Sequence, residues 1–264
     1  RLERVERSGH VEAGMLADVA LPWLWPLGLA TLVLGAIGAL AATELRGLIA
    51  YLVIVSVGTL LAAIGLGSTA VLGAALYYLL HTTLVTGGLF LLAGSIRRQR
   101  GTHGDHLLEI APPLSQPGLF GVLFFIAAVA VVGMPPLSGF VGKLQLLAAT
   151  APGDGISGTQ TAWYWGVLLG GGLLALIALS RAGSRLFWRT EDAPAVAGRA
   201  DRLRVAAAVL LIGASPLLSL FAAPVTAYTR ATAGQLADPS GYIRAVLGHD
   251  GRTAYARADR ETRP

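Results

Sequence analysis

The chain contains no cysteine and only one lysine, and few of its residues carry a charge. Without cysteine there is no disulfide, no thiolate metal site and no cysteine nucleophile. Charged residues make up 13% of the 264, about half the share that is usual in globular proteins, whereas 54% of the residues are apolar. This composition is typical of a membrane protein. The net charge of +5 favours contact with anionic lipid headgroups over nucleic acid, because no basic face is interleaved with aromatic residues.

Several common functional motifs are also absent from the sequence. It has no hydrolase triad, no nucleotide-binding glycine loop and no redox motif, so we expect neither an enzyme nor a bound cofactor. His103, Asp105 and His106 stand close together in a polar segment. That spacing alone is weak evidence for a metal site, and we predict none. The chain begins at Arg1 without a signal peptide, and we expect a fragment whose N-terminal part is missing.

Long apolar runs make up most of the sequence. A bilayer core about 30 Å thick needs about 20 apolar residues for each crossing helix. The sequence predicts an all-α, polytopic transmembrane helix bundle with six crossings, one of which is discontinuous. We expect an extramembrane N-terminal segment at 1–20, the bundle at 21–228 and a polar C-terminal tail at 229–264. The expected spans are 21–43, 47–66, 69–96, 118–150, 162–183 and 204–227.

The discontinuous span is the one at 118–150. A Pro-Pro pair at 135–136 interrupts it, and proline removes a helical donor and clashes with the preceding turn. Each half is too short to cross a bilayer alone. Counting one crossing places Arg46, the arginines at 97–100 and those at 181–204 on the same side, opposite two short loops that have no Lys or Arg. This positive-inside pattern predicts that these arginines are cytoplasmic.

Lys143 is the only lysine among 20 basic residues, and it lies shortly after the break, in MPPLSGFVGKLQLL. An ionisable group at membrane depth is costly and usually marks a functional site. Arginine cannot release its proton in a protein, whereas a desolvated lysine can. Because transporters place ion sites at broken helices, we interpret Lys143 as a proton-carrying residue. The alternative is a lysine that extends to the membrane interface.

His81 lies near the centre of the apolar run at 69–96. Imidazole exchanges protons near neutral pH through either nitrogen, which suits a relay. The alternative is a neutral histidine that is held by a helix–helix hydrogen bond. We predict that His81 and Lys143 share one hydrated path. The polar residues that can support this path are Ser56, Thr59, Thr82, Thr83 and Ser138.

A known family resembles this chain in three stretches, which are ELRGLIAYLVIVSVGTLLAAIGL, ALYYLLHTTLVTGGLFLLAGSI and GMPPLSGFVGKLQLL. The family comprises the antiporter-like subunits that Mrp/Pha-type cation/proton antiporters share with respiratory complex I. The D-type subunits of the antiporters are the most similar branch, and the resemblance covers about residues 21 to 250. It implies a fold of fourteen transmembrane helices with two inverted five-helix repeats, in which this chain would supply helices nine to fourteen.

The resemblance also implies roles for individual residues. The broken span would be helix twelve, Lys143 would stand at the position of the family's proton-channel lysine or glutamate, and His81 would match the relay histidine of helix eleven. Ser56 stands where relatives often carry histidine or glutamine, so a relay through that helix would have to use water. The first repeat, with its glutamate and lysine pair, is absent, and we do not expect the fragment alone to transport.

These observations give one leading hypothesis, a proton-translocating subunit of a bacterial Na+ or K+/proton antiporter in the inner (cell) membrane. The implied partners are the other membrane subunits of such a complex (A, B, C, E, F and G types), protons, Na+ or K+, and lipids, with no nucleic acid. One alternative is a proton-pumping subunit of complex I or of a membrane-bound hydrogenase, which copurifying partners would reveal. The other is a purely structural membrane subunit, which would be indifferent to the loss of Lys143.

Overall fold

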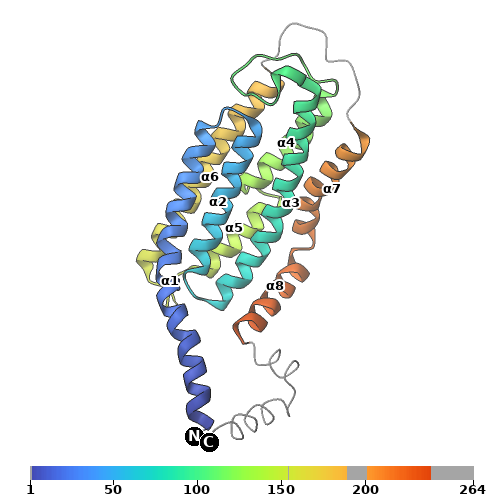
Figure 1. Ribbon diagram of the computed structural model, residues 1–264. Coiled ribbons are helices and arrows are strands. Elements are labelled where there is room, and N and C mark those ends of the chain that lie inside the picture. Colours follow the sequence, from blue (N-terminus) through green and yellow to red (C-terminus); the bar gives the residue numbers. More distant parts are fainter. Residues whose placement is uncertain (1, 154, 189–200, 239–264) are drawn as a thin grey trace, which may run out of the picture.

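The regular elements are all helices in the computed structural model, which describes residues 2–153, 155–188 and 201–238. In chain order they are α1 (Leu2–Ala41), α2 (Leu45–Ile64), α3 (Thr69–Arg100), the short 3-10 helix η1 (Gly101–His103), α4 (Pro117–Val132), α5 (Ser138–Ala149), α6 (Gly158–Phe187), α7 (Arg202–Leu220) and α8 (Ala222–Ala237). They form one elongated bundle in which the long helices lie side by side (Figure 1). The all-α prediction is therefore confirmed.

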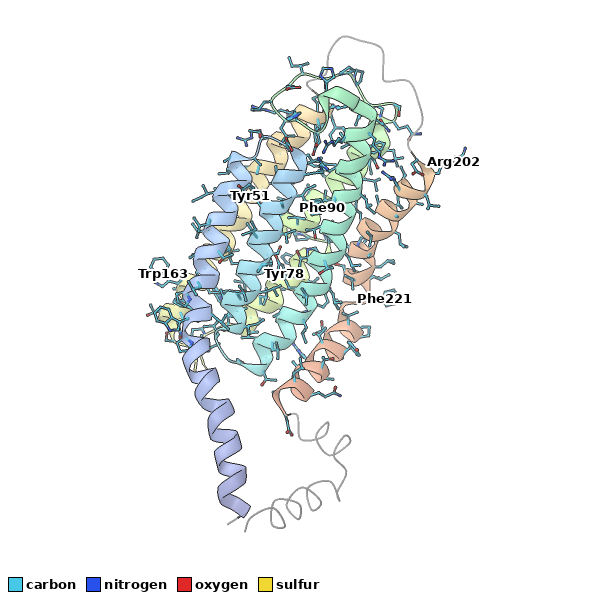
Figure 2. The ribbon with its side chains drawn as sticks, viewed as in Figure 1. Tyr51, Tyr78, Phe90, Trp163, Arg202 and Phe221 are labelled. Atoms are coloured by element: carbon cyan, nitrogen blue, oxygen red, sulfur yellow. The ribbon has the colours of Figure 1, made fainter. Side chains whose placement is uncertain are left out.

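Within the described residues, five helices are long and apolar enough to cross a membrane. They are the Pro22–Ala41 part of α1, together with α2, α3, α6 and α7. Large apolar side chains cover the outside of the bundle, as lipid contact requires. Tyr51, Phe90 and Trp163 lie on this outer surface, whereas Tyr78 is buried inside (Figure 2).

Helices α4 and α5 replace the predicted span at 118–150, and they follow one another along the bundle (Figure 1). Helix α4 has 16 residues and α5 has 12, so each is shorter than the bilayer core requires. The two helices meet closely, because a Cβ atom on Gly139 would collide with the carbonyl oxygen of Ala130. A break at this point therefore depends on a residue without a side chain at position 139.

The last predicted span, 204–227, is interrupted in the structure, which corrects the prediction of one continuous helix. Helix α7 ends at Leu220, and α8 begins two residues later. Pro224 accounts for this, because it has no N–H for the carbonyl of Leu220 and its ring would clash with that carbonyl. It lies instead in the first turn of α8, where a missing N–H costs little. Helix α8 runs to Ala237, into the predicted tail at 229–264, most of which lies outside the described residues.

Arginine contacts gather at one end of the bundle, where α3 and α6 end and α2 and α7 begin. Arg46 forms an ion pair with the buried Asp105, with 3.2 Å between Nε and Oδ2, and its backbone N–H donates to the same oxygen. Arg100, Arg181 and Arg185 each donate to a backbone carbonyl, those of Leu186, Leu40 and Leu107 respectively. Arginines from all three polar segments therefore lie at the same end, as one crossing for 118–150 requires.

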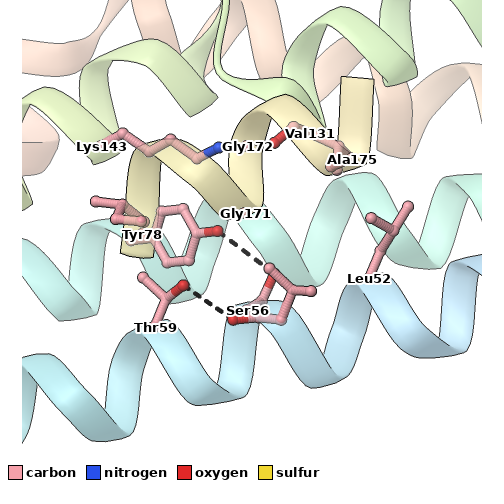
Figure 3. A pocket seen from close by; sticks show the side chains of 11 residues that line it. Leu52, Ser56, Thr59, Tyr78, Val131, Lys143, Gly171, Gly172 and Ala175 are labelled. Carbon is pink, nitrogen blue, oxygen red and sulfur yellow. Dashed lines mark hydrogen bonds between the residues drawn. The ribbon is translucent and has the colours of Figure 1, made fainter. Parts of the chain in front are cut away.

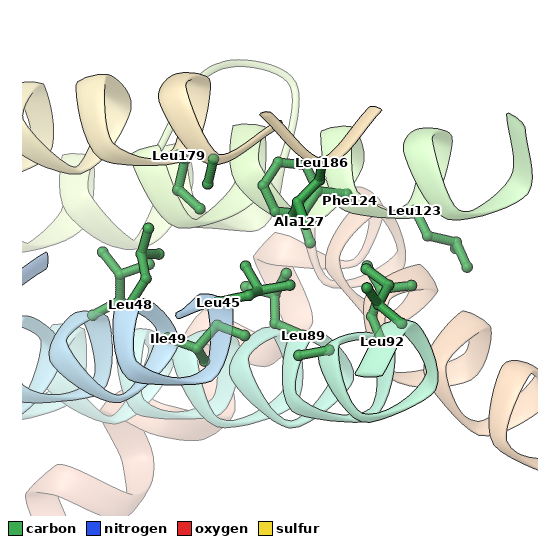
Figure 4. Packing of buried hydrophobic residues seen from close by; sticks show 14 of the residues in the cluster. Leu45, Leu48, Ile49, Leu89, Leu92, Leu123, Phe124, Ala127, Leu179 and Leu186 are labelled. Atoms are coloured by element: carbon green, nitrogen blue, oxygen red, sulfur yellow. The ribbon is translucent and has the colours of Figure 1, made fainter. Parts of the chain in front are cut away.

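A buried apolar cluster fills the part of the bundle next to this end. Figure 4 shows its central members, Leu45, Leu48 and Ile49 from α2, Leu89 and Leu92 from α3, Phe124 and Ala127 from α4, and Leu179 and Leu186 from α6. In lipid, such contacts stabilise a bundle through close packing rather than through removal of apolar surface from water. Glycines bring α1 and α2 closest, because a Cβ atom on Gly28 or Gly58 would collide with the backbone of the other helix.

Candidate functional site

Two backbone carbonyls at the end of α4 lack their usual helical donors. In a continuous helix, the carbonyls of Val131 and Val132 would accept from the N–H groups four residues later. Those positions are Pro135 and Pro136, which have no N–H. Gly133 turns the chain away at this point, with a φ of 84° that favours glycine. The break therefore exposes two acceptors inside the bundle, where an unpaired polar group is costly.

Lys143 supplies the missing donors. Its Nζ atom donates to the carbonyl oxygen of Val132 at 2.7 Å and to that of Val131 at 3.3 Å. The negative end of the α4 dipole also favours a cation here. The lysine belongs to α5 and the carbonyls belong to α4, so this contact links the two halves of the broken helix. An ammonium group has three N–H donors, and these two acceptors leave one of them for water.

A small cavity of about 10 Å³, which is room for about one water molecule, adjoins the ammonium group between α2, α3 and α6. Its polar lining consists of Lys143 on one side and the hydroxyls of Ser56, Thr59 and Tyr78 on the other (Figure 3). Helix α6 contributes Gly172, where a Cβ atom would lie 3.4 Å from Nζ. The absence of a side chain there leaves the lysine accessible from the α6 side.

Hydroxyl groups from α2 and α3 form hydrogen bonds with one another beside this cavity. Thr82 donates to Ser56 with 2.8 Å between the two hydroxyl oxygens, and the Ser56 and Tyr78 hydroxyls are 3.4 Å apart. Thr59 lines the same cavity but donates to a carbonyl of its own helix, that of Val55. These residues form a polar strip that faces Lys143 across the cavity.

His81 is buried, with 2% of its surface exposed, and its hydrogen-bonding neighbour is the first residue of α5. Its Nδ1 atom lies 2.8 Å from the hydroxyl of Ser138. The imidazole ring also packs against the ring of Tyr78, with 5.8 Å between the ring centroids. Gly139 makes room for it, since a Cβ atom there would lie 2.9 Å from Nε2. The histidine is therefore held at the helix break and faces away from the outer surface.

The structure gathers most of the predicted site residues around the break, although it does not join all of them. In the described residues no hydrogen bond joins His81 to Lys143 directly. Tyr78 lines the cavity together with Lys143 and packs against the ring of His81. Thr83 is on the exposed face of α3 and does not belong to the cluster. Thr82, by contrast, donates a hydrogen bond to Ser56.

Two residues of the site were not predicted from the sequence. Tyr78 contacts both the cavity and His81, and its position three residues before His81 on the same helix face was a signal for it. Ser215 of α7 is fully buried, with its hydroxyl 2.7 Å from that of Ser138. It is 77 residues away in the chain, and no local pattern indicates that contact.

The histidines of the polar segment lie elsewhere. His103 is 3.9 Å from a carboxylate oxygen of Glu109, and His106 is 3.7 Å from one of Glu44. Asp105 binds Arg46 instead. In the part of the chain that the structure describes, no group of three such side chains is placed to hold a metal ion.

Comparisons with known proteins identify the relatives of this chain. A family model described as NADH:quinone oxidoreductase/Mrp antiporter, TM, matches residues 10–175. The probable D-type subunit of a K(+)/H(+) antiporter from Rhizobium meliloti (strain 1021) is 34% identical over 257 residues, which cover 89% of this chain and 47% of that protein. The D-type subunit of a Na(+)/H(+) antiporter from Bacillus subtilis (strain 168) is 32% identical over 226 residues, which cover 85% and 44% respectively.

A solved structure agrees with the fold. A chain in the structure of the Mrp complex from Dietzia sp. DQ12-45-1b superposes with a TM-score of 0.70 and 24% identity, covering 88% of this chain and 50% of that one. The present chain thus spans about half the length of the proteins that it matches. The resemblance found in the three sequence stretches is confirmed, and the chain belongs to the NADH:quinone oxidoreductase/Mrp antiporter transmembrane family.

Proposed function

We propose that this chain is part of the proton-translocating subunit of a multisubunit monovalent cation/proton antiporter in a bacterial cell membrane. Membership of the family supports this, and the two relatives are named as subunits of K+ or Na+ antiporters. The observation that carries the proposal is the ammonium group of Lys143, which binds two carbonyls of a broken membrane helix beside a polar cavity. The protein would act as a transporter subunit, with membrane subunits of the A, B, C, E, F and G types as partners.

The proposed topology has six crossings between residues 21 and 228, with α4 and α5 together forming one of them. Helix α4 alone is too short, but α4 and α5 run along the same direction of the bundle (Figure 1). The end with Arg46, Arg100 and Arg185 is then cytoplasmic, as the positive-inside rule predicts. The break, with Lys143 and His81, falls between the two ends, where irregular backbone is tolerated because protein surrounds it.

In the proposed mechanism, Lys143 and His81 exchange protons through water. When the ammonium group releases a proton to water in the cavity, its attraction to the carbonyls of Val131 and Val132 weakens. The amine can then turn toward the hydroxyls of Ser56 and Tyr78 and collect another proton. Since His81 has no direct hydrogen bond to the lysine in the described residues, a bridging water would connect the two. Reversible release is what a lysine allows and an arginine does not.

Substitutions of Lys143 in the complete complex test the proposal. Lys143→Arg keeps the charge and Lys143→Ala removes it, and both should abolish cation-dependent proton exchange in inverted membrane vesicles. Lys143→Glu should retain some exchange, because a carboxylate also titrates. Leu144→Ala, at the exposed neighbouring position, is the control and should exchange normally. Subunit levels on blots would verify assembly, and an arginine variant that exchanges at a near-normal rate would refute the titration argument.

The family description also includes NADH:quinone oxidoreductase, which favours one second candidate, a proton-pumping subunit of a respiratory complex. The relay around Lys143 would be the same, and the partners would differ. Purification of the intact complex from its native membrane separates the two candidates. Six other small membrane subunits would indicate the antiporter, and iron–sulfur proteins would indicate the respiratory complex.

A further inference from the structure

A chain of hydrogen bonds leads from His81 toward α7, away from the Lys143 cavity. Nδ1 of His81 lies 2.8 Å from the Ser138 hydroxyl, which lies 2.7 Å from the Ser215 hydroxyl. His81 is 2% exposed, and both serines are fully buried. Three helices, α3, α5 and α7, each contribute one member. This chain is separate from the hydroxyls around Ser56, which face the cavity.

Helix α7 is held tightly where it carries Ser215. The hydroxyl of Tyr77, one turn before His81 on α3, donates to the carbonyl of Leu218 at 3.0 Å. On the other side of His81, a Cβ atom on Gly88 would come within 2.6 Å of the Ile212 side chain. The contacts on both sides fix the register of α7 against α3. The Ser138–Ser215 contact is therefore a defined feature of the packing.

Polar groups continue beyond Ser215, toward the end of the bundle opposite the arginines. On the arginine side of Ser215, Pro216 has no N–H for the carbonyl of Ile212, which leaves an acceptor without its helical donor one turn before Ser215. One turn after it on the same face, the Ser219 hydroxyl is buried without a partner within the described residues. Further along α5, two turns from Ser138, Gln145 donates to the Thr226 hydroxyl of α8 at 2.8 Å. Water can complete such a line, since it needs a few polar partners.

We propose that Ser138 and Ser215 carry protons between His81 and the α7–α8 side of the bundle, so that α7 is part of the proton path. This rests on the proposed function above. A proton that reaches Nε2 of His81 from the cavity converts the ring to imidazolium, and Nδ1 passes its own proton to Oγ of Ser138. Ser138 then passes its hydroxyl proton to Ser215, which passes its own to a water molecule. Rotation of the two hydroxyls and return of the imidazole to its Nδ1–H form reset the chain, and every step also runs in reverse.

Substitution of Ser215 in the complete complex tests this path. Ser215→Ala should lower the maximal rate of cation-dependent proton exchange by about tenfold, the effect of losing one hydrogen bond of about 1.4 kcal/mol. The KM for Na+ or K+ should not change, and the solvent deuterium isotope effect should rise. Threonine and valine side chains have nearly the same shape, so a comparison of Ser215→Thr with Ser215→Val isolates the effect of the hydroxyl group. The threonine variant should exchange at least several-fold faster than the valine variant.

A buried serine elsewhere provides the control. Ser95 of α3 is also buried, but its hydroxyl donates to the carbonyl of Leu91 in its own helix. Ser95→Ala should therefore exchange at the parent rate. Suppose that Ser215→Ala also exchanges at the parent rate, whereas Lys143→Arg abolishes exchange. The proposed path through α7 would then be refuted, and the proposed function would stand. If the alanine variant fails to assemble, equal rates for the threonine and valine variants would overturn the path.

Discussion

Gly172→Ala should slow proton exchange without disturbing the fold. The new methyl group would lie 3.4 Å from Nζ of Lys143 and 3.8 Å from the carbonyl oxygen of Val132. Both distances are ordinary van der Waals contacts, so no neighbour has to move. The methyl group would, however, occupy the α6 side of the ammonium group. Water on that side could no longer bind the N–H donor that the two carbonyls leave unused.

The size of the effect follows from that lost hydrogen bond. A hydrogen bond to a charged group contributes about 1.5–3 kcal/mol net, and each 1.36 kcal/mol in a barrier is a factor of ten in rate. If the path passes this face of the lysine, exchange should fall by about 10- to 150-fold. Gly170→Ala is a matched control on the same helix, because a Cβ atom there would meet nothing within 4 Å. Both alanines gain the same helix propensity, about 1 kcal/mol, which cancels in the comparison.

The assay is cation-dependent proton exchange in inverted vesicles, measured with a pH-sensitive dye and normalised to the amount of assembled complex. Thermal unfolding of the purified complexes should show no destabilisation in either variant. Equal exchange rates for Gly172→Ala and Gly170→Ala, with equal assembly, would refute the claim that water reaches Lys143 past α6. The cavity beside Ser56 would then be the remaining entrance to the lysine.

Two further predictions concern topology and stability. Because the chain has no cysteine, Leu108→Cys and Thr159→Cys at exposed positions should react with an impermeant maleimide from opposite sides of the membrane, and labelling from one side only would refute the six-crossing topology. Asp105→Ala removes the buried partner of Arg46 and should lower the free energy of unfolding by about 1–3 kcal/mol, measured by thermal unfolding of the complex. The control is Glu109→Ala, which should change that free energy little because the side chain of Glu109 is largely exposed. Equal effects of the two substitutions would show that the Arg46 contact contributes nothing.

The sequence predicted the features that depend on local chemistry. The apolar runs and the Pro-Pro pair predicted the helices and the break, because span length and proline geometry act over a few residues. The burial of His81 followed from its place in the middle of an apolar run. The contact of Ser138 with Ser215 could not be predicted in this way, since it joins helices whose relative rotation depends on packing across the whole bundle. Asp105 was likewise assigned to a polar segment, whereas the fold buries it against Arg46.

Only the Pro-Pro pair at 135–136 was used in the prediction from sequence, but other prolines also help to explain the site. Each proline in a helical run withholds an N–H from the carbonyl four residues earlier. For Pro135 and Pro136 those carbonyls bind Lys143. For Pro216 the carbonyl belongs to Ile212, one turn before Ser215, and for Pro224 it belongs to Leu220, the last residue of α7. The Lys143 contact, the free carbonyl near Ser215 and the end of α7 therefore have the same cause. In each case a proline leaves a backbone carbonyl without its helical donor at membrane depth, which favours a nearby donor or the end of the helix. Counting four residues back from Pro135, Pro136 and Pro216 leads to carbonyls near two of the residues that we propose to carry protons, Lys143 and Ser215.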